Sequence, residues 1–237
     1  LLSIGEEKHV KGAKVFDFSK IQAEKSIVLD MSGEIGTAAV QAPTQIAFTV
    51  KVRGKASHAG FAPQDGVHAI RIAATAIAEM AIGRIGDDTT VNVGHIEGGR
   101  ASNIVPDYCE VSGELRSFSH KKALEELAKV EQIFAKEAEK CGGSIEFIRD
   151  ICYQAYKTDE NESVVKEFQK ACAACGIKSS LIATFGGSDQ NKMSEHGIPG
   201  IVMASAMHQV HSCQEYTEVS EMAQVAGIVS ELLQMKE

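Results

Sequence analysis

The sequence predicts an α/β fold that is interrupted by a smaller α+β unit. Short apolar segments alternate with amphipathic helical segments at both ends of the chain, which is typical of an α/β layer. Between these ends, strand-like and helix-like segments follow in the order β-α-β-β-α-β, the split βαβ arrangement of ferredoxin-like folds. We therefore expect an outer α/β unit over residues 1–42 and 156–237, and an inserted unit over residues 43–155.

The inserted unit begins with an expected strand over residues 44–53, where apolar and polar side chains alternate. Residues 66–82 carry apolar side chains at helical spacing and predict a helix. The remaining expected elements are strands 89–97 and 108–117, a helix at about 120–140 and a strand over 144–155. In this arrangement both helices cover one face of an antiparallel sheet.

The outer unit is expected to alternate short apolar strands with helices. These elements are strands Leu1–Ile4, Ser26–Asp30 and Gly200–Ala204, and helices at about 162–175 and 218–235. A parallel layer normally has paired central strands and both faces covered, and these segments supply too few strands for that. Because the first residue is Leu1 and not Met, we expect further strands from residues upstream or from a partner chain.

Composition argues against several classes of protein. The chain has 24 Lys and Arg against 32 Asp and Glu, so its formal charge is −8, which disfavours contact with phosphate backbones and anionic lipid. No segment approaches the ~20 apolar residues of a membrane-spanning helix. We therefore expect neither a nucleic-acid partner nor a membrane. The six cysteines are scattered among ordinary helix and strand patterns, which favours free thiols and a cytoplasmic location.

Acidic side chains follow two of the expected strands. Gly5-Glu6-Glu7 comes directly after Leu1–Ile4, and Asp30 closes the next strand. Ligands bind at the carboxyl ends of strands in open α/β sheets, and neighbouring side chains on an extended backbone point in opposite directions. One glutamate can therefore bind a metal while the other acts as a general base. The alternatives are a solvated loop for the glutamates and a turn acid for Asp30.

Two histidines follow the expected strand Gly200–Ala204. A neutral imidazole at a strand end is a natural zinc ligand. Because His208 and His211 are three positions apart outside a helix, they need not share a face. We expect His211 to be the ligand and His208 to lie at the surface or beside the ligands.

The inserted unit also contains candidate functional residues. The small-residue loop Gly54–Gly60 leaves His58 free to reach outward, and Asn103 follows a glycine-rich loop. Arg116 can bind a carboxylate through two parallel hydrogen bonds. Its alternative is a surface ion pair, which contributes only about 0–1 kcal/mol. In the outer unit, the glycine turn around Gly187 lacks the Lys and the spacing of a phosphate-binding loop.

Together these motifs resemble the dinuclear zinc metallopeptidase family that contains peptidase T, glutamate carboxypeptidase and the acetylornithine and succinyl-diaminopimelate deacylases. The resemblance covers essentially the whole chain and is closest to the peptidase T branch. The matching motifs are, in order, Gly5-Glu6-Glu7, Val28-Leu29-Asp30, Gly54 to Gly60 around His58, Asn103 to Pro106 leading to Glu114-Leu115-Arg116, Gly186 to Asp189, and His211 with Glu215-Tyr216. The fold it implies is a zinc-peptidase-type α/β catalytic domain, incomplete in this chain, with an inserted ferredoxin-like lid and dimerisation domain.

The resemblance also implies roles at the metal site. Glu6 would be the general base, Glu7 and His211 would bind one zinc ion, and Asp30 would hold the second. Cobalt or manganese could replace zinc at such mixed carboxylate and imidazole sites.

Further implied roles concern the substrate and the dimer. His58 would reach into the active site of a partner subunit and polarise the scissile carbonyl of a small peptide. Asn103, Arg116 and Gly187 would bind that substrate. The inserted unit would mediate the homodimer.

The sequence departs from the family pattern in one respect. The family also has a His-x-Asp strand and a metal-bridging carboxylate before the Glu-Glu pair, and neither precedes Glu6 in this sequence. A catalytic zinc ion usually has about three protein ligands. We therefore expect the full protein to be a two-zinc, tripeptide aminopeptidase-like enzyme and this polypeptide alone to be inactive. The alternatives are an N-acyl amino acid deacylase or carboxypeptidase on the same scaffold, and a non-catalytic dimerisation module.

Overall fold

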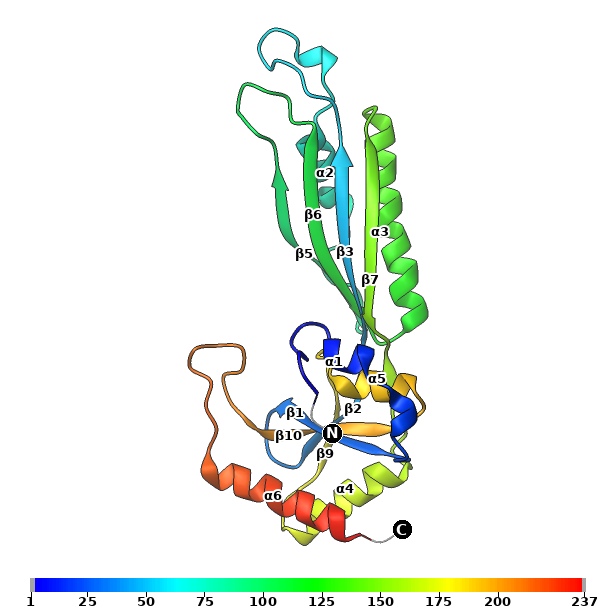
Figure 1. The fold of residues 1–237 in the computed structure, drawn as a ribbon, viewed down its shortest axis with the longest axis vertical. Coiled ribbons are helices and arrows are strands. Elements are labelled where there is room, and N and C mark those ends of the chain that lie inside the picture. The colour runs from blue at the N-terminus through cyan, green and yellow to red at the C-terminus, as the bar shows by residue number, and fades with distance from the viewer. Residues whose placement is uncertain (1–2, 236–237) are drawn as a thin grey trace. The chain divides into compact units, whose positions relative to one another are not determined.

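The computed structural model describes residues 3–235 and divides the chain into two compact units (Figure 1). The outer unit contains the described residues up to Pro43 together with those from Tyr153 onward, and the inserted unit spans Thr44–Cys152. Each unit has its own hydrophobic core. Within residues 3–235, all six cysteines are free, as the sequence predicted, and no helix is both long and apolar enough to cross a membrane.

The inserted unit has the element order that its sequence predicts. Its main elements are β3 (Thr44–Arg53), α2 (Ala69–Glu79), β5 (Thr89–Gly98), β6 (Tyr108–Ser117), α3 (His120–Lys140) and β7 (Ser144–Tyr153). Among the described residues the sheet has the strand order β4-β5-β6-β3-β7, in which β4 is the short strand Gly83–Arg84. β6 pairs antiparallel with both β3 and β5. This order confirms the ferredoxin-like arrangement.

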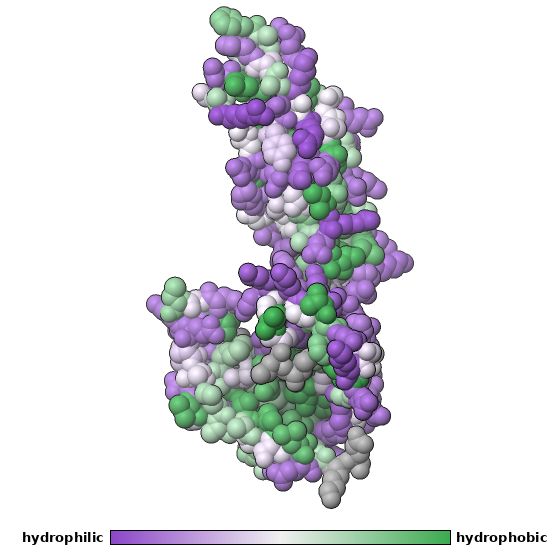
Figure 2. Space-filling model, in the orientation of Figure 1, coloured by the Kyte–Doolittle hydropathy of each residue, from purple (hydrophilic) through white to green (hydrophobic). Residues whose placement is uncertain are grey.

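Alternation along β3 explains why α2 and α3 cover one face of this sheet (Figure 1). Phe48, Val50 and Val52 are at most 2% exposed and belong to the core that includes both helices. Lys51 and Glu110 are partners across β3 and β6 and are only half-buried, and the face of the inserted unit that Figure 2 shows is mainly hydrophilic. Burial of one large apolar side chain stabilises a fold by about 1.5–3 kcal/mol, so a slip of register in β3 would be costly.

Helix α2 is shorter than the expected range of residues 66–82. Lys55 and Val67 form a β-bridge, which keeps the chain extended before the helix. His68 then caps the helix, because its side chain accepts a hydrogen bond from a backbone N–H of the first turn. The helix therefore begins at Ala69, three residues later than apolar periodicity predicts.

The outer unit is built on a mixed sheet. Its strands are β1 (Ser26–Ser32), β2 (Thr37–Ala42), β8 (Tyr156–Lys157), β9 (Ser180–Ala183) and β10 (Gly200–Met207). β1 pairs parallel with β10, β10 pairs antiparallel with β2, and β2 also pairs with β8 and β9. Its longer helices are α4 (Ser163–Ala174) and α6 (Val219–Gln234), and a shorter helix is α5 (Asp189–Glu195). α4 and α6 lie on one side of the sheet and α5 on the other (Figure 1).

The expected strand Leu1–Ile4 is wrong where the structure describes it. The first two residues lie outside the described range, and Ser3 and Ile4 have no strand conformation. An apolar run forms a strand only when a neighbouring strand satisfies its backbone hydrogen bonds, and within residues 3–235 Ser3 and Ile4 join no sheet. The side chain of Ile4 is 83% exposed. The chain continues into α1 (Lys11–Val15) instead.

Candidate active site

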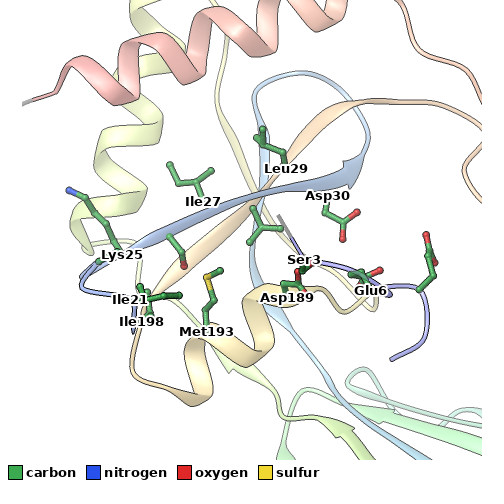
Figure 3. A pocket seen from close by; sticks show the side chains of 14 residues that line it. Ser3, Glu6, Ile21, Lys25, Ile27, Leu29, Asp30, Asp189, Met193 and Ile198 are labelled. Atoms are coloured by element: carbon green, nitrogen blue, oxygen red, sulfur yellow. The ribbon is translucent and has the colours of Figure 1, made fainter. Parts of the chain in front are cut away.

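A cavity of about 710 Å³ lies beside β1 in the outer unit (Figure 3). Its two ends differ in chemistry. Ser3, Glu6, Asp30 and Asp189 gather at one end, and apolar side chains from β1 and α5 line the other. The apolar lining includes Ile21, Ile27, Leu29, Met193 and Ile198. Such a combination of apolar walls and a few converging polar groups is typical of a small-molecule site.

Glu6 lies in this cavity although the described residues before it, Ser3 to Gly5, form no strand. The turn that carries it is fixed by its own backbone, because Val10 N–H donates to the Glu6 carbonyl at 2.8 Å. Burial, and then repulsion from Asp30, Glu7 and Asp189, raises the pKa of Glu6 from 4.5 to about 7. A carboxylate with a pKa near 7 suits a general base at neutral pH.

Asp30 reaches the same cavity from β1. The strand continues to Ser32, so Asp30 lies within it and not at its end. The register with β10 shifts between Leu29 and Met31, and Asp30 has no partner in it. Such irregularities re-aim a side chain. Burial, and then repulsion from Glu7 and Asp189, raises the pKa of Asp30, while His211 lowers it.

The predicted ligands Glu7 and His211 meet in the structure. His211 Nδ1 lies 3.4 Å from Glu7 Oε2. Both side chains are largely exposed, at 70% and 73%, so no core packing brings them together. Since Glu7 and Asp30 both line the cavity, the acids of the Glu-Glu pair, the strand acid and the imidazole converge on one place.

His208 is held at the base of the loop that carries His211. Its Nε2 forms a close hydrogen bond with the Glu221 carboxylate. Its ring stacks on Tyr216 with centroids 4.8 Å apart. His208 therefore has a defined set of partners. The sequence alone predicts only that it lies at the surface or beside the ligands.

Gly187 lies where another side chain leaves no room. A Cβ atom at this position would stand 2.0 Å from Cζ of Tyr153. Packing against the Tyr153 ring is therefore sufficient to require a glycine here, and Gly187 also lines a small cavity with Asp30.

Sequence reasoning missed Asp189. It begins α5 directly after the helix cap Ser188, and Ser3 Oγ donates a short hydrogen bond to its Oδ2. Its other carboxylate oxygen is buried and has no hydrogen-bond partner among the described residues. The signal was present in the Gly186 to Asp189 motif, but a glycine turn followed by polar residues does not by itself indicate a buried carboxylate.

In the inserted unit the structure brings His58 and Asn103 together. His58 forms a β-bridge with Ile104, and the N–H of Ala59 donates to the Asn103 carbonyl at 2.9 Å. These contacts pair the two loops that sequence reasoning singled out separately.

The His58 ring is oriented by its own loop. The backbone N–H groups of Gly60 and Phe61 donate to Nδ1 at 3.1 and 3.2 Å. Because Nδ1 accepts both bonds, the neutral ring carries its proton on Nε2. The Phe61 ring, 86% exposed, lies 4.4 Å from the imidazole. The loop therefore presents His58 as a hydrogen-bond donor through Nε2.

Arg116 does not join His58 and Asn103. Tyr108 at the start of β6 pairs with Arg53, the last residue of β3 before the loop that carries His58. Arg116 lies near the other end of β6, roughly 27 Å from Tyr108 along an extended strand. Its Nε donates to Glu114 Oε1 at 2.9 Å, and Gln45 donates to the other oxygen of Glu114 at 2.6 Å. Arg116 therefore forms an ion pair with Glu114, which is the alternative that the sequence also allowed.

The donor atoms at the outer-unit site fit a divalent cation in kind but not in number. Carboxylate and imidazole ligands suit zinc, cobalt and manganese. Within residues 3–235, however, no group of three or more His, Cys, Asp or Glu side chains is close enough to hold a metal ion. Glu7 and His211 form a pair, and Glu7 and Asp30 both line the cavity.

Comparison with known proteins identifies similar chains. Residues 43–141 match the M20 peptidase dimerisation domain. The chain is 36% identical over 234 residues to the uncharacterized protein YqjE of Bacillus subtilis strain 168, covering 99% of this chain and 63% of that protein. It thus spans less than two thirds of that relative's length.

Two solved structures are similar across nearly the whole chain. Aminopeptidase PepT of Bacillus cereus ATCC 10987 has a TM-score of 0.89 and 37% identity, covering 98% of this chain and 63% of that one. A tripeptidase of Staphylococcus aureus Mu50 has a TM-score of 0.94 and 32% identity, covering 98% and 62%.

Proposed function

Because the chain belongs to the peptidase T-like branch of the M20 family, we propose that the protein is a metal-dependent aminopeptidase acting on small peptides. Tripeptides are the proposed substrates, and the enzyme works as a cytoplasmic homodimer. The observation that carries the proposal is the contact between Glu7 and His211, beside the partly buried Glu6. Acids from two segments and one imidazole from a third come together here, which supports a shared ligand.

Glu7 and His211 would hold one zinc ion, and Asp30 would hold a second. Bound zinc supplies Lewis-acid polarisation of the peptide carbonyl and lowers the pKa of the attacking water. Each ion needs about three protein ligands, and we propose that the remaining ones come from outside residues 3–235. Without them this polypeptide would bind zinc weakly and be inactive.

Glu6 would act as the general base. It takes a proton from the attacking water and delivers it to the nitrogen of the leaving amine, as one group in two steps. Burial and the surrounding carboxylates keep its pKa at about 7 before a cation binds. A cation nearby would offset that repulsion and favour the carboxylate form.

His58 would donate a hydrogen bond from Nε2 to the carbonyl oxygen as negative charge develops there. Such a donor typically accounts for about 2.7–4 kcal/mol of the barrier. We propose that it does so in the active site of the partner subunit, with Asn103 beside it. The match of residues 43–141 to a dimerisation domain supports a dimer.

Arg116 would serve a different site from the His58 of its own chain. The two residues lie toward opposite ends of the strands of the inserted unit, so one substrate cannot reach both within a single inserted unit. We propose that Arg116 binds the terminal carboxylate of the peptide, which would require Glu114 to share or release the guanidinium. Gly187 keeps the proposed role of bordering the substrate, in addition to its packing against Tyr153.

The test is hydrolysis by the full-length protein after reconstitution with zinc. Release of the N-terminal residue from tripeptides supports the proposal. Cleavage of N-acyl amino acids alone would replace it with a deacylase. Fewer than about one zinc ion per chain, with neither substrate cleaved, would identify a non-catalytic dimerisation module.

A further inference from the structure

The loop that carries His211 is closed at its base by a pair of residues. His208 and Tyr216 exchange backbone hydrogen bonds, with N–H to carbonyl distances of 3.1 and 3.2 Å. Their rings stack above this bridge with centroids 4.8 Å apart. The segment between them, residues 209–215, is therefore a short loop with a defined base and His211 in its middle.

This closed loop has a strained backbone. Gln209 has a φ of 50° and His211 a φ of 61°, in the left-handed region that non-glycine residues rarely adopt. Inside the loop, Ser212 Oγ donates to the Gln209 carbonyl at 2.7 Å and accepts from Gln214 N–H at 3.1 Å. Strained conformations of this kind persist only where the surrounding structure holds them.

One side-chain contact ties the loop base to the core. His208 Nε2 forms a close hydrogen bond with the carboxylate of Glu221, which lies in the first turn of α6. The two side chains are 29% and 33% exposed, so water screens the pair only in part. α6 in turn is anchored by Val225 and Ile228, which are 8% and 0% exposed in the core of the outer unit.

We propose that His208 and Glu221 are positioning residues, whose side-chain hydrogen bond holds the strained His211 loop in the conformation that meets Glu7. The proposal rests on the proposed function in one respect, because it takes His211 as a metal ligand. Partners that orient a ligand without touching the metal commonly change metal affinity by about 10–100-fold when they are removed. His208 and Glu221 differ from the usual case, because they act on the backbone of the ligand's loop and not on its ring.

The experiment compares five variants of the full-length protein, one of which, His211→Ala, removes the proposed ligand itself. Glu221→Ala and His208→Ala break the pair, and His208→Gln keeps a side-chain N–H that can still donate to Glu221. Glu218→Ala is the matched control, because Glu218 is an exposed carboxylate one turn earlier whose side chain does not cap α6.

The first measurement is amide hydrogen exchange of residues 209–215 in the metal-free protein. We expect at least about tenfold faster exchange when the pair is broken, since local opening then costs less free energy. His208→Gln should restore part of the protection, and Glu218→Ala should exchange like the wild type. Unchanged exchange at Val225 and Ile228 will identify a local effect and not a loss of fold.

The second measurement is zinc affinity, by competition with a chromogenic chelator. Glu221→Ala and His208→Ala should bind zinc about 10–100-fold more weakly. Wild-type exchange and wild-type affinity in both variants would overturn the positioning role. Wild-type affinity in His211→Ala would instead overturn His211 as a ligand and with it this part of the proposed function, whatever the exchange rates.

Discussion

His211 Nδ1 lies 3.4 Å from Glu7 Oε2, although the two residues belong to segments near opposite ends of the chain. Both side chains are more than two thirds exposed. An exposed ion pair contributes only about 0–1 kcal/mol, so attraction between these two groups is too weak to explain their meeting. The proposed cation would attract both groups and reduce the repulsion among the neighbouring acids.

Glu6→Gln should abolish turnover and leave metal binding intact. Glutamine has nearly the same shape but cannot take a proton from water, and loss of a general base typically slows a reaction about 10²–10⁴-fold. Turnover of a tripeptide and zinc content per chain are measured on the same full-length preparation. Glu7→Gln is the control and should lose zinc. A Glu6→Gln enzyme with near-normal turnover would exclude Glu6 as the base.

The metal-free protein should lose stability as the pH rises from about 4.5 to about 7. The pKa of Glu6 is raised from 4.5 to about 7 in the folded state, so between these values the folded chain binds more protons than the unfolded chain, and stability falls with increasing pH. The pKa of Asp30 is also raised, which has the same sign.

Because Glu6 is only partly buried, we expect its share of this loss to be about 1–2 kcal/mol. The measurement is denaturant unfolding at pH 5 and pH 8 in a chelator. The stability of Glu6→Gln should depend less on pH than that of the wild type. Addition of zinc should reduce this difference in pH dependence between the two proteins. An identical pH dependence in the variant would refute the cause that we assign.

Asp30→Asn should lower the zinc content by about one ion per chain, since an amide is a much poorer ligand than a carboxylate. Elemental analysis of the reconstituted full-length protein measures this. Glu160→Gln, which neutralises an exposed acid outside the cavity, is the control and should bind zinc as the wild type does. An Asp30→Asn protein with unchanged zinc content would remove Asp30 from the ligand set.

The inserted unit could be predicted from sequence because its pattern is simple. Phe48, Val50 and Val52 alternate with polar residues and fix one buried face, so the period of β3 is visible without a structure. β2 was missed for the opposite reason. Its residues Ala38 and Ala39 are small, lie next to each other and are both fully buried, so no alternation marks them as a strand.

Glu6 and His211 could be selected from the sequence because their residue types suit base and metal chemistry, and their roles stay predictions. The candidate site was not predictable where a residue acts through its place in the fold. Asp189 is one acid among 32 Asp and Glu until α5 brings it to the cavity. His208 becomes informative only once Glu221 of α6 is seen beside it. Contacts between distant segments leave no local signal in the sequence.

Gly187→Ala should destabilise the outer unit by about 1–3 kcal/mol, the usual cost of forcing an extra methyl group into a filled space. The added Cβ would stand 2.0 Å from the Tyr153 ring. Gly186→Ala is a matched control, because its nearest atom would lie at an ordinary 3.4 Å. Thermal unfolding of both variants measures the difference. Equal stabilities would show that Tyr153 does not require the glycine.

The action of His58 in a partner's active site can be tested by mixing two inactive variants. Glu6→Gln has lost the base and His58→Ala has lost the carbonyl donor, so each homodimer should be nearly inactive. In a heterodimer, the His58→Ala chain contributes Glu6 and the Glu6→Gln chain contributes His58, which completes one site out of two. Random pairing makes half of the dimers mixed, so activity should return to about a quarter of the wild-type value.

Action within one chain predicts a different result, because neither site of the heterodimer would then contain both residues and mixing would restore nothing. Mixing Glu6→Gln with the double variant Glu6→Gln/His58→Ala should also restore nothing in either case, which controls for effects of mixing itself. Co-expression with two affinity tags allows the heterodimer to be isolated and its tripeptide turnover measured directly. The inserted unit pairs the His58 and Asn103 loops by itself, so Glu6→Gln, which lies in the outer unit, should not disturb the donor that the partner receives.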